Sequence, residues 1–405
     1  MASIPELHDL KLWADPNAVQ VNRLPMRTPF VSASSIRVSL NGDWRIKRFA
    51  HPEDIALREL GELCDDSDWV SIPVPSNWTQ FDLGDVPHYT NIAMPWRETP
   101  PHLPKEVPTA VYRRNFKVES AWSDRRIVLH VGAAESVHSV RVNGEFVGYG
   151  TDSRLASEYD ISPFVREGMN LVSITVCRYS AQSYVEDQDQ WWHGGITRSV
   201  KLFSTDLVYI EKFATTAGLK ADSTTGTLKI DAVIGSIKGK SVDGYTLRTS
   251  IEELPKVKSA QLSATYKHHV TPTWTEMSAE LQEANRKHFA GEYWDGSMPE
   301  SAKRLREPLQ SPWPGHIVLE TTVPKVAAWS AETPALYTLR IELISPTGQV
   351  VEVSQQKIGF RSVVVKGRDL LVNGKRVFIY GVNRHDFNRH TGRVLSREDM
   401  RQDLL

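Results

Sequence analysis

Alternating hydrophobic and polar positions organise much of the first half of the chain. Four segments show a period of two residues: AVYRRNFKV (110–118), RRIVLHVG (125–132), VHSVRVNGEFVGYG (137–150) and NLVSITVCRYS (170–180). This period predicts half-buried antiparallel strands, and short strands at such spacing favour a sandwich. We therefore expect a mainly β protein whose first domain is a sandwich over 36–206, preceded by an N-terminal arm over 1–35.

Turn and breaker residues divide these strands. Asn-Gly pairs at 41–42, 143–144 and 373–374 predict tight hairpins, because both residue types tolerate positive φ. The proline-broken stretch 70–78 fits only an edge strand that runs into a loop. The stretch HYTNIAMPWRETPPHLP (88–104) holds too many prolines for a helix or a central strand, so we expect a long ordered loop.

A second group of alternating segments follows at 207–363. Its length and strand spacing favour an immunoglobulin-like sandwich, with a hairpin turn at Pro346-Thr347-Gly348. The pattern lapses near 255–314 into a polar stretch rich in Lys, Arg and Glu. We interpret this stretch as an insertion with a solvated surface and one short helix.

The pattern of hydrophobic and polar residues changes again at 364–405. Val377–Val382 is an uninterrupted apolar run, which is typical of a parallel strand buried on both faces. Ser396 and Asp399 form a capping-box pattern that predicts a helix start. A strand, a polar loop and a helix make one βα unit, which cannot bury its own apolar faces, so a third domain is expected to begin here.

Composition excludes several classes of partner. The 405 residues carry a formal net charge of −1, which gives no basic field for nucleic acid and no polybasic signal for a membrane. The two cysteines, Cys64 and Cys177, lie far apart and suggest neither a disulfide framework nor a zinc site. The N-terminus lacks the apolar run of a secretory signal, and no apolar stretch is long enough to span a bilayer. We expect a cytoplasmic protein.

The candidate site is the stretch SYVEDQDQWWHGGITR at 183–198. Three carboxylates, Glu186, Asp187 and Asp189, stand directly before Trp191 and Trp192. Pyranose rings present apolar C–H faces to aromatic rings and hydroxyl groups to carboxylates, so this composition suits a sugar ligand. The alternative is a turn between two strands whose tryptophans belong to the core. One of Glu186 and Asp187 is expected to hold the loop by accepting backbone amide hydrogen bonds.

Seven phrases occur in one order along the chain. They are LNGDW (40–44), VPSNW (74–78), YTN (89–91), VNGEFVGYGTDSRLASEYDIS (142–162), YVEDQDQWW (184–192), IGFR (358–361) and LVNGKRVFIYGVNRHD (371–386). In these phrases the chain closely resembles the N-terminal part of the glycoside hydrolase family 2 β-galactosidases. The resemblance covers nearly the full length, apart from the arm and the 255–314 insertion.

The resemblance implies an architecture and a set of site residues. It implies a jelly-roll sugar-binding domain at 36–206, an immunoglobulin-like sandwich at 207–363 and the start of a catalytic (β/α)8 barrel at 364–405. By motif, Asn91, Asp189 and His385 resemble the residues that contact galactose, and Asp189 also resembles a sodium ligand. Arg384 is expected to pair with a barrel carboxylate. For Trp191 and Trp192 the resemblance favours packing over sugar stacking.

The resemblance also implies a reaction, namely hydrolysis of terminal β-galactosides such as lactose with retention, by two glutamates. Both glutamates are expected beyond Leu405, together with the ligands of the family's magnesium site, and Glu398 lies on a helix where it cannot replace them. We therefore expect the 405-residue chain alone to be inactive and the full-length enzyme to be a homo-oligomer. The alternatives are a β-glucuronidase or β-mannosidase of the same family, and a non-catalytic carbohydrate-binding protein.

Overall fold

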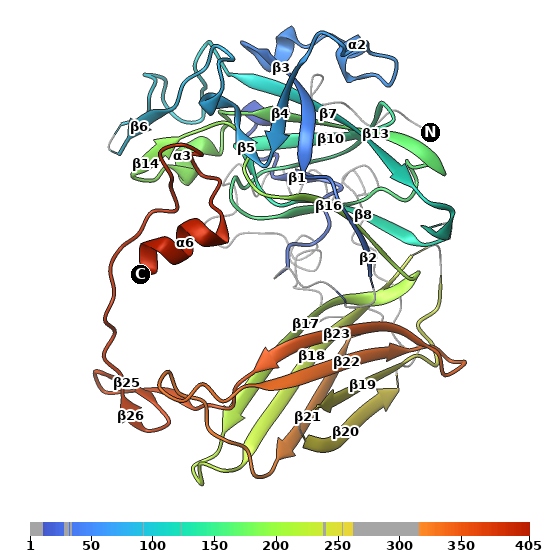
Figure 1. The fold of residues 1–405 in the computed structure, drawn as a ribbon, viewed down its shortest axis with the longest axis vertical. Helices are drawn as coiled ribbons and strands as arrows, with labels where there is room; N and C mark the ends of the chain where they lie inside the picture. Colours follow the sequence, from blue (N-terminus) through green and yellow to red (C-terminus); the bar gives the residue numbers. More distant parts are fainter. Residues whose placement is uncertain are drawn as a thin grey trace, which may run out of the picture.

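Two β-sandwiches and a C-terminal segment make up the computed structural model (Figure 1). The structure describes residues 11–27, 32, 35–91, 93–122, 124–237, 240–252, 254–261 and 316–405. The C-terminal segment leaves the second sandwich through a small hairpin sheet and runs back to the first sandwich, where a loop near β14 precedes the final helix α6 (Figure 1). The C-terminal segment therefore packs against the same domain in which the chain begins.

The first sandwich consists of a seven-stranded and a four-stranded sheet. The larger sheet has the order β1 (Gln20–Val21), β11 (Glu145–Gly150), β10 (Val137–Val142), β13 (Gly168–Cys177), β7 (Thr109–Val118), β3 (Gly42–Phe49) and β4 (Val70–Val74). The smaller has the order β12 (Ser157–Asp160), β8 (Arg126–Val131), β16 (Val200–Thr205) and β2 (Ile36–Ser39). The inward-facing side chains, among them Trp44, Tyr112 and Tyr159, form one buried core. The predicted sandwich is confirmed, and β4 is the predicted edge strand.

Short elements close the rims of this sandwich. Two small sheets have the orders β5 (Ser76–Asn77), β15 (Gly195–Ile196), β9 (Ala134–Glu135) and β14 (Gln190–Trp192), β6 (His88–Thr90). The short helices are η1 (Leu12–Ala14), η2 (Pro52–Asp54), α2 (Leu57–Leu60), η3 (Trp78–Gln80), η4 (Ser120–Trp122) and α3 (Ser183–Glu186). Of the loop predicted at 88–104, residues 88–90 join a sheet, and residues 91 and 93–104 form no strand.

The hairpin predicted at Asn41-Gly42 is wrong. β2 pairs with β16 in the smaller sheet, whereas β3 pairs with β4 and β7 in the larger one. The Asn41 side chain donates a 3.0 Å hydrogen bond to Ser199 Oγ and accepts one of 3.0 Å from the Val200 amide. Gly42 adopts a φ of 114°. The dipeptide thus turns the chain from one sheet to the other, a use that also requires positive φ.

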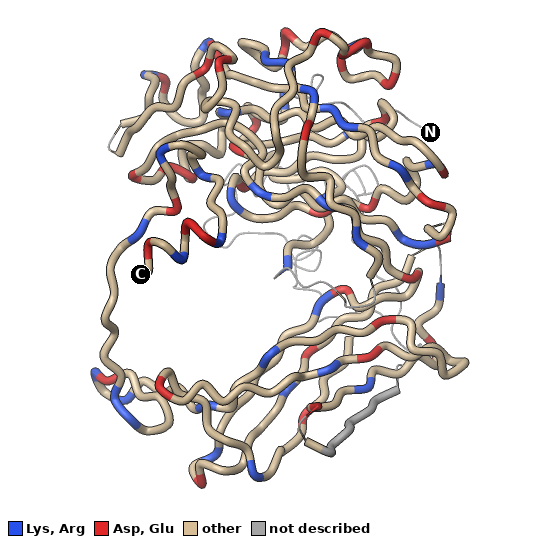
Figure 2. The backbone as a smooth tube through the Cα atoms, in the orientation of Figure 1, with Lys and Arg blue, Asp and Glu red and all other residues tan. Residues whose placement is uncertain are grey.

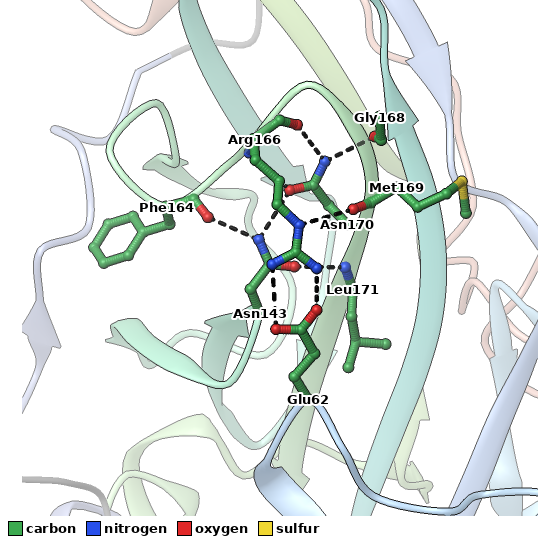
Figure 3. A network of polar contacts seen from close by, with 8 residues as sticks. All are labelled: Glu62, Asn143, Phe164, Arg166, Gly168, Met169, Asn170 and Leu171. Carbon is green, nitrogen blue, oxygen red and sulfur yellow. Dashed lines mark hydrogen bonds and ion pairs between the residues drawn. The ribbon is translucent and has the colours of Figure 1, made fainter.

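The hairpin predicted at Asn143-Gly144 is confirmed, and side chains reinforce it (Figure 3). Asn143 and Gly144 have φ values of 52° and 83°, as a type I′ turn requires. The Asn143 amide nitrogen donates to the Phe164 carbonyl and to Asn170 Oδ1, both at 2.9 Å, and its Oδ1 accepts from the Leu171 amide. The asparagine therefore ties the β10–β11 turn to the start of β13 and to the loop before it.

The second sandwich also has two sheets. Their orders are β17 (Val208–Leu219), β18 (Gly226–Ser236), β21 (Ile317–Val323) and β20 (Leu254–Gln261), β19 (Thr246–Ile251), β22 (Tyr337–Ile344), β23 (Val350–Ile358). The turn predicted at 346–348 joins β22 to β23. β20 extends to Gln261, so regular structure continues past 255, where the insertion was predicted to begin. Residues 262–315, which hold the rest of that predicted insertion, lie outside the described residues.

Charged side chains join the two sandwiches. Arg27 pairs with Glu158 at 2.9 Å and donates to the Glu211 carbonyl. The Arg126 guanidinium lies 3.9 Å from the centre of the Tyr209 ring. Opposite these groups, Glu352 of β23 is buried and accepts a 2.7 Å hydrogen bond from the Ile210 amide. The junction between the domains is therefore polar and contains a buried carboxyl group.

The C-terminal part begins with a sheet of β24 (Val363–Lys366), β25 (Asp369–Val372) and β26 (Lys375–Arg376) and ends with α6 (Arg397–Leu404). The predicted hairpin at 373–374 and the Ser396–Asp399 capping box are confirmed. The buried strand predicted at Val377–Val382 is wrong for this structure, because these residues form no ladder and Tyr380 is 93% exposed. A parallel strand needs strands of further βα units beside it, and this chain supplies one unit.

Acidic and basic residues are mixed over both sandwiches and the C-terminal segment (Figure 2). This distribution agrees with the small net charge of the sequence. Among the described residues, none of the helices has the length and apolar character needed to cross a membrane.

Candidate sugar-binding site

The predicted site lies at one rim of the first sandwich, where α3, β14 and β6 meet (Figure 1). β14 pairs with β6 in antiparallel register, with Gln190 opposite Thr90, Trp191 opposite Tyr89 and Trp192 opposite His88. The acidic stretch and the proline-rich loop, about 100 residues apart in sequence, therefore form one short sheet.

Asn91 and Asp189 lie at the same end of this sheet. Asn91 follows β6 directly and Asp189 precedes β14 directly, and Thr90 pairs with Gln190, so both residues lie just beyond the same end of the pair. Both are exposed. The structure thus brings together two of the three predicted contact residues.

A tyrosine fixes the aspartate. The Tyr89 hydroxyl donates a hydrogen bond to Asp189 Oδ1. This hydrogen bond, together with partial desolvation and the charge of Asp189, raises the pKa of Tyr89. Tyr89 was not among the predicted site residues. The available signal was its place two residues before Asn91, on the same face of a period-two segment.

His385, the third predicted residue, comes from the C-terminal segment and is exposed. The Phe387 amide donates a 2.9 Å hydrogen bond to the His385 carbonyl, so the two residues form a tight turn. The Phe387 ring stacks on Trp191 with a centroid separation of 6.2 Å and an interplanar angle of 14°. The segment that carries His385 therefore lies against the β14 strand that follows Asp189.

The two neighbouring acids, Glu186 and Asp187, are less exposed than Asp189. Glu186 accepts hydrogen bonds from the Ser153 amide at 2.8 Å and from Ser153 Oγ at 2.5 Å, which confirms that one of the two acids holds the loop through a backbone amide. Burial raises the pKa of Glu186, and the hydrogen bonds from Ser153 oppose this shift. Asp187 is half-buried beside it. Of the three acids, Asp189 is the exposed one.

The two tryptophans differ in environment. Trp192 is buried, stacks on His88 with centroids 6.0 Å apart and meets Trp96 edge-to-face at 5.9 Å. The Arg178 guanidinium donates a 2.9 Å hydrogen bond to the Trp192 carbonyl and so anchors β14 to the sandwich. Trp191 keeps 41% of its surface exposed. Packing is thus confirmed for Trp192, while Trp191 contacts the C-terminal segment.

A buried histidine follows the tryptophans. His193 Nδ1 lies 2.8 Å from Thr79 Oγ1 in a hydrogen bond. Burial, together with the nearby charge of Arg393, lowers the pKa of His193 to about 3, so the ring is neutral at physiological pH. A neutral, buried imidazole supports the rim and is not exposed to a sugar.

The oxygen atoms of Asp189 and Asn91 at this rim are of the type that binds a hard cation such as sodium. Sodium takes oxygen ligands, and Asp189 and Asn91 offer a carboxylate and an amide carbonyl at the same end of the β6–β14 pair. Among the described residues there is no group of three or more His, Cys, Asp or Glu that could hold a metal ion. Asp189 therefore fits as one ligand of a site that needs further oxygen atoms.

Arg384 forms the predicted pair with a carboxylate of the C-terminal part. Its Nη2 lies 2.5 Å from Asp403 Oδ2 on α6, and its Nη1 pairs with Asp386. These ion pairs, with hydrogen bonding to Asp403 as the largest contribution, raise the pKa of Arg384. The arginine ties the loop after Val382 to the final helix.

Family models match the chain in three consecutive parts. Residues 37–206 match the sugar binding domain of glycosyl hydrolases family 2, residues 208–361 match a second domain of glycosyl hydrolases family 2, and residues 363–405 match its TIM barrel domain. These three ranges together cover the chain from the end of the N-terminal arm to its last residue.

Curated relatives and solved structures agree with these matches. The chain is 33% identical to a β-galactosidase of Psychromonas ingrahamii (92% of this chain, 32% of that protein) and 31% identical to one of Enterobacter cloacae (97% and 35%). It spans about a third of the length of these relatives. In structure it is similar to a Bifidobacterium dentium β-glucuronidase (TM-score 0.64, 17% identity, 94% of this chain, 57% of that one) and a Bacteroides uniformis β-glucuronidase (0.65, 19%, 91%, 38%). The chain belongs to glycosyl hydrolase family 2.

Proposed function

We propose that the chain is the N-terminal part of a retaining β-galactosidase that hydrolyses terminal, non-reducing β-D-galactosides. The observation that carries this proposal is the position of Asn91 and Asp189, which are exposed and lie just beyond the same end of the β6–β14 pair. The relatives named β-galactosidase, at 31–33% identity, support the same substrate class.

The rim residues have the chemistry of a sugar contact. The Asn91 side chain donates and accepts hydrogen bonds, and the Asp189 carboxylate accepts from neighbouring hydroxyl groups. Hydrogen bonds to a charged group contribute about 1.5–3 kcal/mol each. An epimer with one hydroxyl reversed leaves such a group unpaired, which is a physical basis for selecting galactose. In this proposal His385 completes the contacts from the barrel side.

The charge of Asp189 favours a neutral sugar over a uronic acid. A carboxylate attracts hydroxyl hydrogens but repels the carboxylate of a glucuronide held at the same place. The similarity to solved β-glucuronidases is below 20% identity and concerns the fold alone. A sodium ion held by Asp189 would supply a further ligand for sugar hydroxyl oxygens.

The reaction needs two carboxyl groups about 5 Å apart, one acting as acid and base and one as nucleophile. We propose that both are glutamates of the barrel beyond Leu405. Glu398 lies in the first turn of α6, where its role is to complement the positive helix end. In this proposal the 405 residues bind and orient the sugar, and the chemical step is carried by later residues.

The test compares glycosides in the polypeptide that the gene encodes. We expect kcat/KM for nitrophenyl β-galactoside to exceed that for the β-glucuronide and the β-mannoside by at least about 100-fold. Asp189→Asn should lower kcat/KM for the galactoside by about tenfold or more. Asp68→Asn, the same charge change at an exposed residue of the first sandwich, should leave it unchanged.

Three outcomes would contradict the proposal. Faster hydrolysis of the glucuronide or mannoside would assign another specificity within the family. Equal activities of the Asp189 and Asp68 variants would remove Asp189 from the sugar contact. Selective galactose binding in calorimetry, with no turnover of any glycoside, would identify a non-catalytic sugar-binding protein.

A further inference from the structure

The segment 387–394 lies on the sandwich rim, although it is about 200 residues away from it in sequence (Figure 1). Phe387 stacks on Trp191, and its ring centre is also 5.9 Å from that of His193. Asn388 and Gly392 exchange backbone hydrogen bonds of 2.8 and 2.7 Å, so the segment is a closed turn. Residues 387–394 therefore form a closed turn that is docked on the rim of the first sandwich through aromatic ring contacts.

An arginine fixes the other end of this turn. Arg393 Nη2 donates a 2.9 Å hydrogen bond to the Trp191 carbonyl, and its Nε lies 3.5 Å from Glu135 Oε2. The side chains of Arg393 and Glu135 are 10% and 8% exposed. Removing one partner of a buried ion pair leaves an uncompensated charge, so this contact resists separation of the two segments.

A close backbone approach completes the docking. Asn77 Nδ2 donates a 2.7 Å hydrogen bond to the Thr391 carbonyl. Gly392 has a φ of 61°, and a Cβ atom there would lie 2.6 Å from Asn77 Nδ2 and 2.9 Å from His193 Cε1. The close approach and the positive φ therefore leave no room for a side chain at position 392.

Trp191 contacts both Phe387 and Arg393, at the two ends of this turn. Its ring stacks on Phe387, its carbonyl accepts from Arg393, and its ring centre lies 5.8 Å from that of its cross-strand partner Tyr89. Tyr89 in turn holds Asp189. A continuous set of contacts thus runs from Asp189 through Tyr89, Trp191 and Phe387 to the turn that contains His385.

We infer that Trp191 is a positioning residue that aligns the sugar contact from the barrel segment, His385, with the contact from the sandwich, Asp189. This inference rests on the proposed function for the role of those two residues, but the docking itself does not. One face of the Trp191 ring is occupied by Phe387, which favours support over direct stacking on a sugar.

Docking is tested first, in the 405-residue chain, by hydrogen exchange of the Asn388 and Gly392 amides. Trp191→Ala should speed exchange by about tenfold, the loss expected for a well-packed aromatic pair. Trp191→Phe should keep most of the protection. Val185→Ala, at a 79% exposed residue of the neighbouring helix α3, is the matched control and should change nothing.

A second variant keeps the test valid if Trp191→Ala disturbs the sandwich. Phe387→Ala changes the other partner, which lies outside the sandwich core, and should speed exchange to a similar extent. The double variant should be no faster than either single one, because both remove the same contact. Additive effects, or unchanged exchange in Phe387→Ala, would overturn the docking role.

Alignment is tested in the polypeptide that the gene encodes. Trp191→Ala should raise KM for the galactoside several-fold with a smaller change in kcat, and Trp191→Phe should restore KM, since a loss of shared binding contacts raises KM. An unchanged KM alongside faster exchange would overturn the inference. Absence of galactosidase activity in the unmodified protein would instead refute the proposed function, and the exchange result would stand separately.

Discussion

The Tyr89 hydroxyl donates a hydrogen bond to Asp189 Oδ1 across the β6–β14 pair. The contact joins the beginning of the proline-rich loop to the acidic stretch, so neither side of the rim positions Asp189 alone. It also leaves the second carboxylate oxygen, Oδ2, available to a ligand. The tyrosine therefore orients the group to which the proposed sugar contact is assigned.

Removing this hydroxyl should weaken sugar binding without unfolding the rim. Tyr89→Phe keeps the ring that packs against Trp191 and deletes the donor to Asp189. We expect the affinity for galactose, measured as an inhibition constant in the gene-encoded polypeptide, to fall about two- to tenfold. An unchanged inhibition constant would show that Asp189 is held by other groups.

A glycine in the docked turn should be intolerant of a side chain. Gly392→Ala places a Cβ atom 2.6 Å from Asn77 Nδ2 in a backbone conformation with φ of 61°, which alone costs about 1 kcal/mol. Proteolysis of the 387–394 turn should become faster. Gly381→Ala is the control, because a Cβ atom there meets nothing within 4 Å. Equal cleavage of the two variants would contradict the close approach.

Most of the fold follows from the sequence because burial imposes a period. The alternation at 110–180 places side chains such as Tyr112 and Val172 inside one core, and the structure has strands there. The Asn-Gly motif at 41–42 shows the limit of such reasoning. Its positive φ is a local property, but whether the next strand joins the same sheet depends on contacts with Ser199 and Val200, far along the chain.

The contacts that surround the predicted site residues were not predictable from the sequence. Motif resemblance gave Asn91, Asp189 and His385 as the predicted site residues, and the first two lie just beyond the same end of the β6–β14 pair. Neither the hydrogen bond from Tyr89 nor the stacking of Phe387 on Trp191 has a local signature, because each joins segments about 100 residues apart or more. The strand prediction at Val377–Val382 was wrong although its local signal is strong. A parallel strand forms only beside neighbouring strands, and the described residues place none there.

The isolated 405-residue chain should show only background hydrolysis of nitrophenyl β-galactoside. The expectation follows from the proposed place of the two catalytic glutamates, since Glu398 lies exposed in the first turn of α6, where it complements the positive helix end. The gene-encoded polypeptide is the positive control. Turnover by the isolated chain above that of its Asp189→Asn variant would refute the placement.

A buried glutamate should make the domain junction weaker as pH rises. Burial raises the pKa of Glu352 to about 7, against the opposing hydrogen bond from the Ile210 amide and the charges of Arg27 and Arg126. Because the folded pKa exceeds the unfolded value of 4.5, protonation favours the folded state. That stability is fully present below about pH 4.5 and is lost as pH rises through 7.

Glu352→Gln should therefore stabilise the chain at pH 8 and have little effect at pH 5. Glutamine keeps an oxygen that can accept from the Ile210 amide and removes the buried charge, which corresponds to a gain of order 3 kcal/mol at most, since one pKa unit is about 1.4 kcal/mol. Urea unfolding at both pH values measures the difference. Glu145→Gln, at an exposed residue of β11, controls for the change in net charge. A variant less stable at pH 8 would mean that the charged form of Glu352, held by Arg27 and Arg126, is the one that joins the two sandwiches.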